Sequence, residues 1–200
     1  MTRRTYVVGI TGASGAIYAR RLLETLLAAD CQVQLSISPS GAAVIEQELG
    51  LSIDLDRFRV ADLLPAVDKP DRVRYWHYED YSSPMASGSA RSDGMVVCPC
   101  SGSTLSAIAH AASGNLIQRA AEVHLKERRK LIVVPRETPL SLPQIDNLRA
   151  CAVAGAVVLP AMPGFYHGAT TLDDLVNFVV ARICDQLGIE HTLMRRWGEG

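Results

Sequence analysis

A run of small residues near the start of the chain has the composition of a phosphate-binding turn. It reads Gly9-Ile10-Thr11-Gly12-Ala13-Ser14-Gly15 and lies between an apolar segment and a segment with helical periodicity. Glycines allow a tight backbone turn, and the free amides at the start of a helix can hold a phosphate. The spacing GxxGxxG alone therefore predicts only a nucleotide or a phosphate as ligand.

Two missing features narrow the choice of ligand. The second predicted strand ends in Ser36-Ile37-Ser38, without an Asp or Glu that could bind the ribose diol of a dinucleotide. The sequence also lacks the GxxxxGK(S/T) pattern of a nucleoside triphosphate site. Both NAD and ATP are thereby disfavoured.

A second polar loop follows a later predicted strand and opens another helix. It reads Pro99-Cys100-Ser101-Gly102-Ser103-Thr104. Ordinary N-capping by Ser and Thr is the alternative to ligand binding for this loop. Together with Ser38, which also ends a strand, the two loops favour a mononucleotide at the carboxyl edge of a sheet.

Cations form a second group of candidates. Arg119 and Lys126 are seven residues apart and share one face of a predicted helix, although Glu122 precedes Lys126 by four and an exposed ion pair is the alternative. Arg136 directly follows a strand at the edge where ligands collect. Arg182 lies in an apolar helix, where a ligand and a surface role are equally open. The run 128–130 is expected only to complement a helix dipole.

A metal site is not expected. Asp173-Asp174 is followed by Leu175, Val176 and Asn177, so it does not complete a DDxxD motif that could hold magnesium. Cys98-Pro99-Cys100 lacks a second Cys or His pair at zinc spacing. The five cysteines lie mostly in apolar stretches, which suits buried reduced thiols. Tyr166 and Trp197 could instead offer ring faces to a cation, with simple packing as the alternative.

The elements that must position these residues alternate along the chain. Strands are predicted at 6–10, 32–37, 94–97, 131–134 and 157–159, and helices at 17–29, 42–49, 104–112, 116–126, 141–154 and 172–187. This order predicts a three-layer, doubly wound α/β fold with a mainly parallel, Rossmann-like sheet. Between Asp54 and Arg91 the pattern weakens, and we expect an irregular excursion ending in a loop of small residues.

Length and composition limit the function classes. With 200 residues and 48% hydrophobic residues, the chain predicts a single domain over 1–189, followed by a tail over 190–200 that we expect to pack on a neighbouring subunit. A net charge of -1 gives no reason to expect nucleic acid as a partner. The chain has no apolar run of the roughly 18 residues that a membrane span needs, and it begins Met1-Thr2-Arg3-Arg4 without a signal-peptide core, so we expect a cytoplasmic protein without a membrane partner.

Seven stretches, in this order, give the chain a family resemblance over nearly its whole length. They are Thr11-Gly12-Ala13-Ser14-Gly15, Ala86-Ser87-Gly88-Ser89, Cys98-Pro99-Cys100-Ser101, Asn115-Leu116-Ile117-Gln118-Arg119-Ala120, Leu125-Lys126-Glu127-Arg128-Arg129, Val134-Pro135-Arg136-Glu137 and Pro163-Gly164-Phe165-Tyr166-His167. On these stretches the sequence resembles the flavin prenyltransferases of the UbiX type. Such a set is far more specific than one glycine turn.

The resemblance implies a metal-independent transferase of ubiquinone biosynthesis. Its members bind reduced FMN noncovalently as co-substrate and join to it a dimethylallyl group, at nitrogen 5 and then at carbon 6. Dimethylallyl monophosphate is the expected donor, although the sequence does not distinguish it from the diphosphate. The prenylated FMN is supplied to UbiD-type decarboxylases. Members form homo-oligomers, often dodecamers, with sites at subunit contacts.

The resemblance also assigns roles by position. The implied flavin contacts are Gly12, Ala13, Ser14, Ser38, Ser101, Gly102, Ser103, Thr104 and Arg136. The implied contacts to the prenyl phosphate are Ser87, Arg119, Lys126, Tyr166 and Arg182. Ser14 and Glu48 correspond to a proton-handling catalytic pair, with Glu137 as an assistant. From the residues alone Glu48 would be a surface glutamate, and Pro39 stands after Ser38 where many relatives carry a basic residue.

Two other functions stay open. One is an FMN-dependent decarboxylase of a small acid or a peptidyl cysteine, which would share the fold. None of the five histidines lies in a His-Phe-Cys-Asp context, and only His167 is near an expected site. The other is a carrier that binds FMN without changing it.

Overall fold

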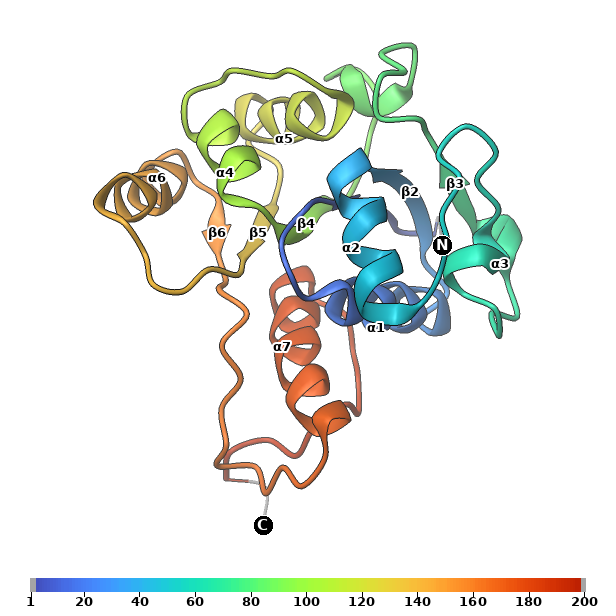
Figure 1. Cartoon of the computed structure of the whole chain (residues 1–200), viewed down its shortest axis with the longest axis vertical. Helices are drawn as coiled ribbons and strands as arrows, with labels where there is room; N and C mark the ends of the chain where they lie inside the picture. Colours follow the sequence, from blue (N-terminus) through green and yellow to red (C-terminus); the bar gives the residue numbers. More distant parts are fainter. Residues whose placement is uncertain (1–2, 199–200) are drawn as a thin grey trace.

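The structure, a computed structural model, describes residues 3–198 and is built on a six-stranded parallel sheet (Figure 1). Residues 1–2 of the predicted domain and residues 199–200 of the predicted tail lie outside the described range. The strands have the order β3-β2-β1-β4-β5-β6. Their bounds are β1 Thr5–Ile10, β2 Gln32–Ile37, β3 Val73–Tyr75, β4 Gly94–Cys100, β5 Leu131–Pro135 and β6 Val157–Val158.

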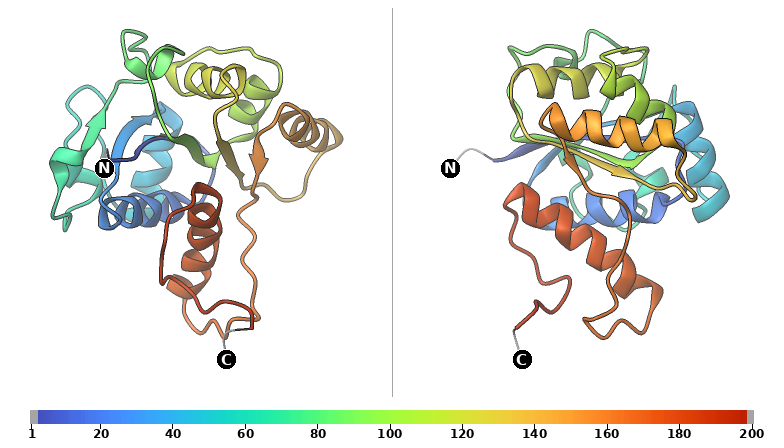
Figure 2. Two further views of the ribbon diagram at one scale, coloured as in Figure 1. Left: turned by 180° about the vertical axis from the view of Figure 1, so that it is seen from behind. Right: turned by 90° about the vertical axis from the view of Figure 1, so that its left-hand side faces the viewer.

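Helices cover both faces of the sheet, as the edge-on view in Figure 2 shows. The helices α4, α5 and α6 lie on one face, and α1 and α7 lie on the other. The bounds are α1 Ala16–Ala28, α2 Pro39–Leu49, α3 Val60–Leu63, α4 Gly102–Ala109, α5 Leu116–Lys126, α6 Leu142–Val153 and α7 Leu172–Leu187. Two short 3-10 helices, η1 Pro70–Arg72 and η2 Pro84–Ala86, complete the set. The predicted three-layer α/β fold is confirmed.

The central strands β1, β4 and β5 are buried on both faces because their residues are apolar in succession. In β1, Tyr6 and Val8 pack into a core shared with α1 and α7, whereas Val7 packs into a second core with α4 and α5. Continuous apolar strands are typical of parallel sheets that carry helices on both sides. The central strands thus form a rigid platform whose carboxyl edge can hold polar loops.

Several element boundaries differ from the sequence prediction. The helix α2 begins at Pro39 rather than 42, because Ser38 caps it by accepting the Gly41 amide. Likewise α4 begins at Gly102 and ends at Ala109, rather than spanning 104–112, with Ser101 as its cap. Ser and Thr side chains before a helix satisfy its first amides, so the helix starts directly after them.

The expected irregular excursion contains one strand that the sequence prediction missed. The three residues of β3 pair in parallel with β2, with Leu35 opposite Tyr75. Only Val73 of the strand is buried, so no alternation of apolar and polar residues marks it. The predicted strand at 157–159 is also shorter in the structure, where β6 spans Val157–Val158.

The described part of the tail contacts its own chain. Asp185 near the end of α7 accepts hydrogen bonds from His191 Nε2 at 3.1 Å and from Arg196 at 2.8 Å. The indole ring of Trp197 meets the Tyr166 ring edge to face, with centroids 5.3 Å apart. Packing of the tail on a neighbouring subunit stays a prediction. Among residues 3–198, no helix has both the length and the apolar character that crossing a membrane requires.

Candidate functional site

Three loops from the carboxyl edge of the sheet are bonded directly to one another. The Thr11 hydroxyl, just after β1, donates to the Pro99 carbonyl at 2.8 Å and accepts from the Ser101 amide at 2.8 Å, which joins it to the loop after β4. Arg136, just after β5, donates from Nε to the Ser14 carbonyl oxygen at 3.3 Å. The structure thus brings Ser14, Ser101 and Arg136 to one rim, where ligands bind in open α/β sheets.

The glycine turn is shaped by two close approaches. A Cβ atom on Gly12 would lie 2.5 Å from the Ser40 side chain at the start of α2, so no larger residue fits there. Gly15 has φ +118, a left-handed conformation that glycine adopts without the steric cost of a side chain. The two glycines therefore let the turn pass closely between the starts of α1 and α2.

Glu48 of α2 occupies part of the start of α1. Its carboxylate accepts the Gly15 amide at 2.9 and 3.1 Å and the Ala16 amide at 2.8 Å. The prediction of free amides at this helix start is therefore wrong for Gly15 and Ala16, whose amides bind Glu48. The amides of Gly12 and Ser14 donate to no acceptor in the described chain. Glu48 lies at the surface, yet its carboxylate is fixed beside Ser14.

The surroundings of Glu48 favour its ionised form. Partial burial alone would raise the pKa of this carboxyl group, but hydrogen bonds from the Ser14 hydroxyl and the Gly15 and Ala16 amides, with the nearby charge of Arg136, outweigh it. The net pKa is lowered from its ordinary value. At neutral pH the group is a carboxylate, which can accept a proton and cannot donate one.

The start of α4 offers a further set of donors. Ser101 accepts the Thr104 amide at 3.3 Å, and its hydroxyl lies 3.1 Å from that of Ser103. The amides of Gly102 and Ser103 have no acceptor within residues 3–198. Free amides and hydroxyls at a helix start suit an anionic or carbonyl-bearing ligand, so these residues fit a flavin mononucleotide.

Glu137 lies on the same rim, beside Arg136. It is exposed, and its Oε1 accepts the Thr138 amide at 3.1 Å, while Gln144 Nε2 donates to its Oε2 at 3.4 Å. Ser38 joins the rim through its amide, which donates to the Ile10 carbonyl at 3.0 Å. Glu137 is thus open to a ligand held by the rim, whereas the buried Ser38 hydroxyl already accepts the Gly41 amide at 3.1 Å.

Three of the predicted prenyl phosphate contacts lie on the α5 side of the sheet. Arg119 Nε donates to the Ala86 carbonyl at 3.2 Å, which places it at the loop that carries Ser87. The expected pair between Glu122 and Lys126 does not form, since Glu122 accepts from Arg119 at 3.1 Å and Lys126 pairs with its neighbour Glu127. The structure thus groups Ser87, Arg119 and Lys126 around one helix.

The other two predicted contacts lie on the opposite side of the sheet. Tyr166 is 54% exposed and packs edge to face on Phe178 of α7, with ring centroids 5.7 Å apart. Arg182 of α7 pairs with Asp185 at 2.7 Å. Because α5 and α7 cover opposite faces, one chain does not bring all five residues together (Figure 2).

His167 follows Tyr166 in the sequence, and both of its ring nitrogens are buried without a hydrogen-bond partner. Its ring stacks on Phe178 at a centroid distance of 5.2 Å. Asp174, in the acidic pair considered for metal binding, instead accepts the amides of Thr170 and Thr171 at 2.9 Å and caps α7. Over the described chain, no three His, Cys, Asp or Glu side chains gather as a metal site would require.

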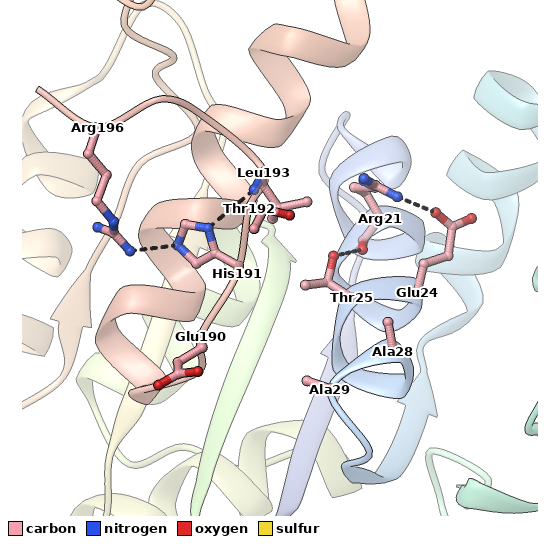
Figure 3. Close-up of a pocket in the computed structure, with 10 residues that line it drawn as sticks. All are labelled: Arg21, Glu24, Thr25, Ala28, Ala29, Glu190, His191, Thr192, Leu193 and Arg196. Atoms are coloured by element: carbon pink, nitrogen blue, oxygen red, sulfur yellow. Dashed lines mark hydrogen bonds and ion pairs between the residues drawn. The ribbon is translucent and has the colours of Figure 1, made fainter. Parts of the chain in front are cut away.

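A surface pocket between α1 and the tail lies away from the rim. Figure 3 shows this pocket, about 720 Å³ in volume, between α1 and the tail, with Arg21 and Glu24 on one side and His191 on the other. It contains none of the predicted site residues. We place the functional site at the rim instead, because free donors, a fixed carboxylate and a cation come together there.

Sequence reasoning missed two residues of the site region. Thr11 links the loops after β1 and β4, and its side chain is 2% exposed. The signal in the sequence that could have identified it is a hydroxyl residue directly after a predicted strand. Arg129 donates to the Gly88 and Ala90 carbonyls, whereas only a dipole role was expected for the run 128–130. Backbone carbonyls carry no sequence signature, so this second contact could not be predicted.

The sheet order and the donors at its carboxyl edge define a nucleotide-binding α/β protein of the flavoprotein kind. Comparison with known proteins agrees, since residues 1–184 match the Flavoprotein family. The flavin prenyltransferase UbiX of Alkalihalophilus pseudofirmus is 50% identical over 192 residues, covering 96% of this chain and 95% of the relative. That of Pseudomonas aeruginosa is 43% identical, covering 96% and 93%. The chain belongs to the UbiX flavin prenyltransferases of the flavoprotein family.

Solved structures of relatives have the same fold over nearly their full length. AnUbiX (PadA1), crystallised in complex with FMN and dimethylallyl pyrophosphate, superposes with a TM-score of 0.87 at 36% identity and covers 98% of both chains. A dodecameric FMN-dependent UbiX-like decarboxylase from Escherichia coli O157:H7 gives 0.85 at 39% identity, covering 96% of this chain and 98% of the other. The peptidyl-cysteine decarboxylase EpiD, at 16% identity and a TM-score of 0.55, shares the fold alone.

Proposed function

We propose that this protein transfers a dimethylallyl group from dimethylallyl monophosphate to reduced FMN and so makes prenylated FMN for a UbiD-type decarboxylase. The observation that carries the proposal is the rim at which Ser14, Glu48 and Arg136 contact one another in a chain of the UbiX family. A carboxylate held beside a hydroxyl and a cation is suited to proton transfer next to an anionic co-substrate.

The rim residues would hold the flavin. The free amides of Gly12, Gly102 and Ser103, with the hydroxyls of Ser38 and Thr104, supply donors and acceptors, and Arg136 supplies positive charge. When bound, reduced FMN supplies the nucleophilic nitrogen 5 and then carbon 6 as the points of bond formation. Gly12 and Ala13 have small side chains or none, so they leave room for a planar ring against the backbone.

The chain's own residues would handle the charge and the protons. Arg119 and Lys126 would stabilise the phosphate as its bond to the prenyl carbon breaks, which is the reason we propose a metal-independent reaction. Tyr166 would present its ring to the allylic group, and Arg182 would add a further cation. Glu48, ionised at neutral pH, would accept a proton through the Ser14 hydroxyl, with Glu137 as an assistant at the rim.

The proposal is tested by weighing the flavin. The protein is mixed anaerobically with reduced FMN and either dimethylallyl monophosphate or the diphosphate, and the flavin is then measured by mass spectrometry. A flavin heavier by one prenyl unit, formed from the monophosphate, supports the proposal. Unmodified flavin with both donors intact would instead support a carrier of FMN or a flavin-dependent decarboxylase.

We further propose that the site is completed between chains of a homo-oligomer. One chain holds the predicted phosphate contacts on opposite faces of its sheet, and the related protein from Escherichia coli is described as dodecameric. A role in ubiquinone biosynthesis within the cytoplasm is consistent with five free cysteines that are all buried, as expected for a reducing compartment.

A further inference from the structure

The loop that carries Ser87 does not hold itself in place. It follows η2 and leads into β4, and within it the Ser87 and Ser89 hydroxyls lie 2.9 Å apart while the Ser89 amide donates to Ser87 Oγ at 3.3 Å. Both serines are exposed. The Ala90 amide also donates to the Ser87 carbonyl at 3.3 Å. These contacts are all local, so the position of the loop against α5 depends on its contacts with α5 and with the residues that follow that helix.

Arg129 supports the loop through two hydrogen bonds. Its two terminal nitrogens donate to different backbone carbonyls of the loop, one to Ala90 at 2.6 Å and the other to Gly88 at 2.5 Å. The two carbonyls flank Ser89. The planar guanidinium group can span two acceptors at once, which the single ammonium of a lysine cannot do with the same geometry.

The end of α5 directs Arg129 toward the loop. Arg128 adopts a left-handed conformation with φ 53, and the Arg129 amide donates back to the His124 carbonyl at 2.8 Å. This reversal resembles the motif that ends many helices with a glycine. Arg128 is exposed after the turn, whereas Arg129 is half-buried against the loop.

The loop also lies directly on the cation predicted to bind the phosphate. A Cβ atom on Gly88 would come close to Glu127 Oε1 and within 2.7 Å of Lys126 Nζ, the two partners of one ion pair. The backbone of the loop and the Lys126 ammonium group are therefore in close contact. Any shift of the loop away from α5 changes the separation between the Ser87 hydroxyl and the Lys126 charge.

His124 reinforces the far end of the loop. Its side chain is buried, with Nδ1 2.7 Å from the Ala120 carbonyl and Nε2 2.8 Å from the Ser92 hydroxyl. Burial lowers the pKa of His124, a carbonyl contact opposes this, and the charge of Arg129 lowers it further. In the neutral ring Nδ1 must carry the hydrogen to meet a carbonyl, so Nε2 accepts from Ser92.

We propose that Arg129 is a positioning residue for the prenyl phosphate subsite. By binding the carbonyls of Gly88 and Ala90 it sets the loop against α5, so that the Ser87 hydroxyl and the Lys126 ammonium group face one phosphate. Arg129 itself does not contact the substrate. This inference rests on the proposed function, because it concerns the same phosphoester.

The test compares Arg129→Lys with its neighbour Arg128→Lys, which keeps the same charge but makes no loop contact. Binding of dimethylallyl monophosphate to the FMN-loaded protein is measured by calorimetry. We expect Arg129→Lys to weaken this binding about tenfold, with unchanged FMN affinity, and Arg128→Lys to bind like the wild type. Gly88→Ala, which leaves the Arg129 side chain unchanged but puts a methyl group against the ion-paired side chains of Glu127 and Lys126, should weaken binding in the same way.

Backbone hydrogen exchange gives a second readout that needs no substrate. Amides of residues 87–92 should exchange faster in Arg129→Lys than in Arg128→Lys. Unchanged exchange, or wild-type binding of the ester by Arg129→Lys, overturns the positioning role. A wild-type protein that binds the ester without forming a heavier flavin would overturn the proposed transferase function and leave the positioning role supported.

Discussion

The Glu48 carboxylate accepts the Ala16 amide at 2.8 Å, across 32 residues of sequence. A side chain of α2 thereby caps the start of α1, and the glycine turn is closed by an anion that belongs to the chain. A carboxylate at a helix start is stabilised by the helix dipole. The same contact fixes the group beside Ser14, where a proton would have to move.

Replacing Glu48 by Gln should slow prenyl transfer while FMN still binds. The amide keeps the size of the carboxylate but cannot take up a proton, so we expect a loss of about 10²-fold or more in the single-turnover rate. Rapid anaerobic mixing followed by mass analysis of the flavin measures this rate. Glu46→Gln, on an exposed part of the same helix, is the matched control, and equal rates in the two variants would remove Glu48 from the mechanism.

The contribution of Glu48 to stability should depend on pH. Its folded-state pKa lies below the ordinary value of 4.5, so its stabilising effect is complete above the unfolded pKa and is lost as the pH falls through the folded pKa. At neutral pH we expect the free energy of unfolding of the wild type to exceed that of Glu48→Gln by about 0.5 kcal/mol. The difference is small because Glu48 is exposed. Urea unfolding at pH 7 and at acid pH checks this. A difference that grows on acidification would contradict the assignment.

Arg136→Ala should weaken FMN binding without destabilising the fold. The side chain is only partly buried, and its hydrogen bond joins the Ser14 carbonyl at 3.3 Å, so few core contacts depend on it. We expect the Kd for FMN to rise about tenfold, measured by quenching of flavin fluorescence. Arg149→Ala on α6 controls for the loss of a positive charge. Equal FMN affinity in both variants would show that Arg136 is not a flavin contact.

Gly9→Ala should destabilise the protein through a clash in the core. A Cβ atom at this position would lie 2.6 Å from Cγ2 of Ile117 on α5, in an interior that cannot expand freely. We expect a loss of about 1–3 kcal/mol in the free energy of unfolding. Ile117→Ala removes the side chain that the new methyl group would meet. The double variant should therefore lose less free energy of unfolding than the sum of the losses in the two single variants. Strict additivity would show that this contact does not limit the packing.

Mixed oligomers can show whether two chains share a site. Lys126→Ala and Tyr166→Ala change residues that lie on opposite faces of the sheet, and each variant alone should be nearly inactive. If neighbouring chains supply the two residues, coexpression of the variants should restore transfer in about one quarter of the sites. Activity per site in purified mixed assemblies measures this. Mixtures as inactive as the single variants would place both residues in the same chain's site.

The layered fold could be predicted because its signals are local. Apolar strands such as Tyr6–Ile10 and the glycines after them report burial and turning directly in the sequence. The short strand Val73–Tyr75 was missed, since its conformation is set by pairing with β2 and not by its own pattern. Pairing energy from a distant segment leaves no periodicity in the strand itself.

The rim was predicted more completely than its internal contacts. Residue types at strand ends pointed to Ser14, Ser101 and Arg136, and the structure brings them together. The capping role of Glu48 could not be read from the sequence, because an exposed helical glutamate has no feature that reveals a bond to amides 32 and 33 residues away. Contacts to backbone groups, such as those of Arg129, are hidden from sequence for the same reason.

The placement of α5 and α7 on opposite faces of the sheet affects how the protein would behave on dilution. If neighbouring chains share the site as proposed, each chain would present two parts of a catalytic centre on opposite faces, and a neighbour would have to complete each part. The rate of turnover would then depend on protein concentration, because mass action sets the fraction of chains that are associated. Dilution that separates the subunits would abolish catalytic activity even where each chain stayed folded.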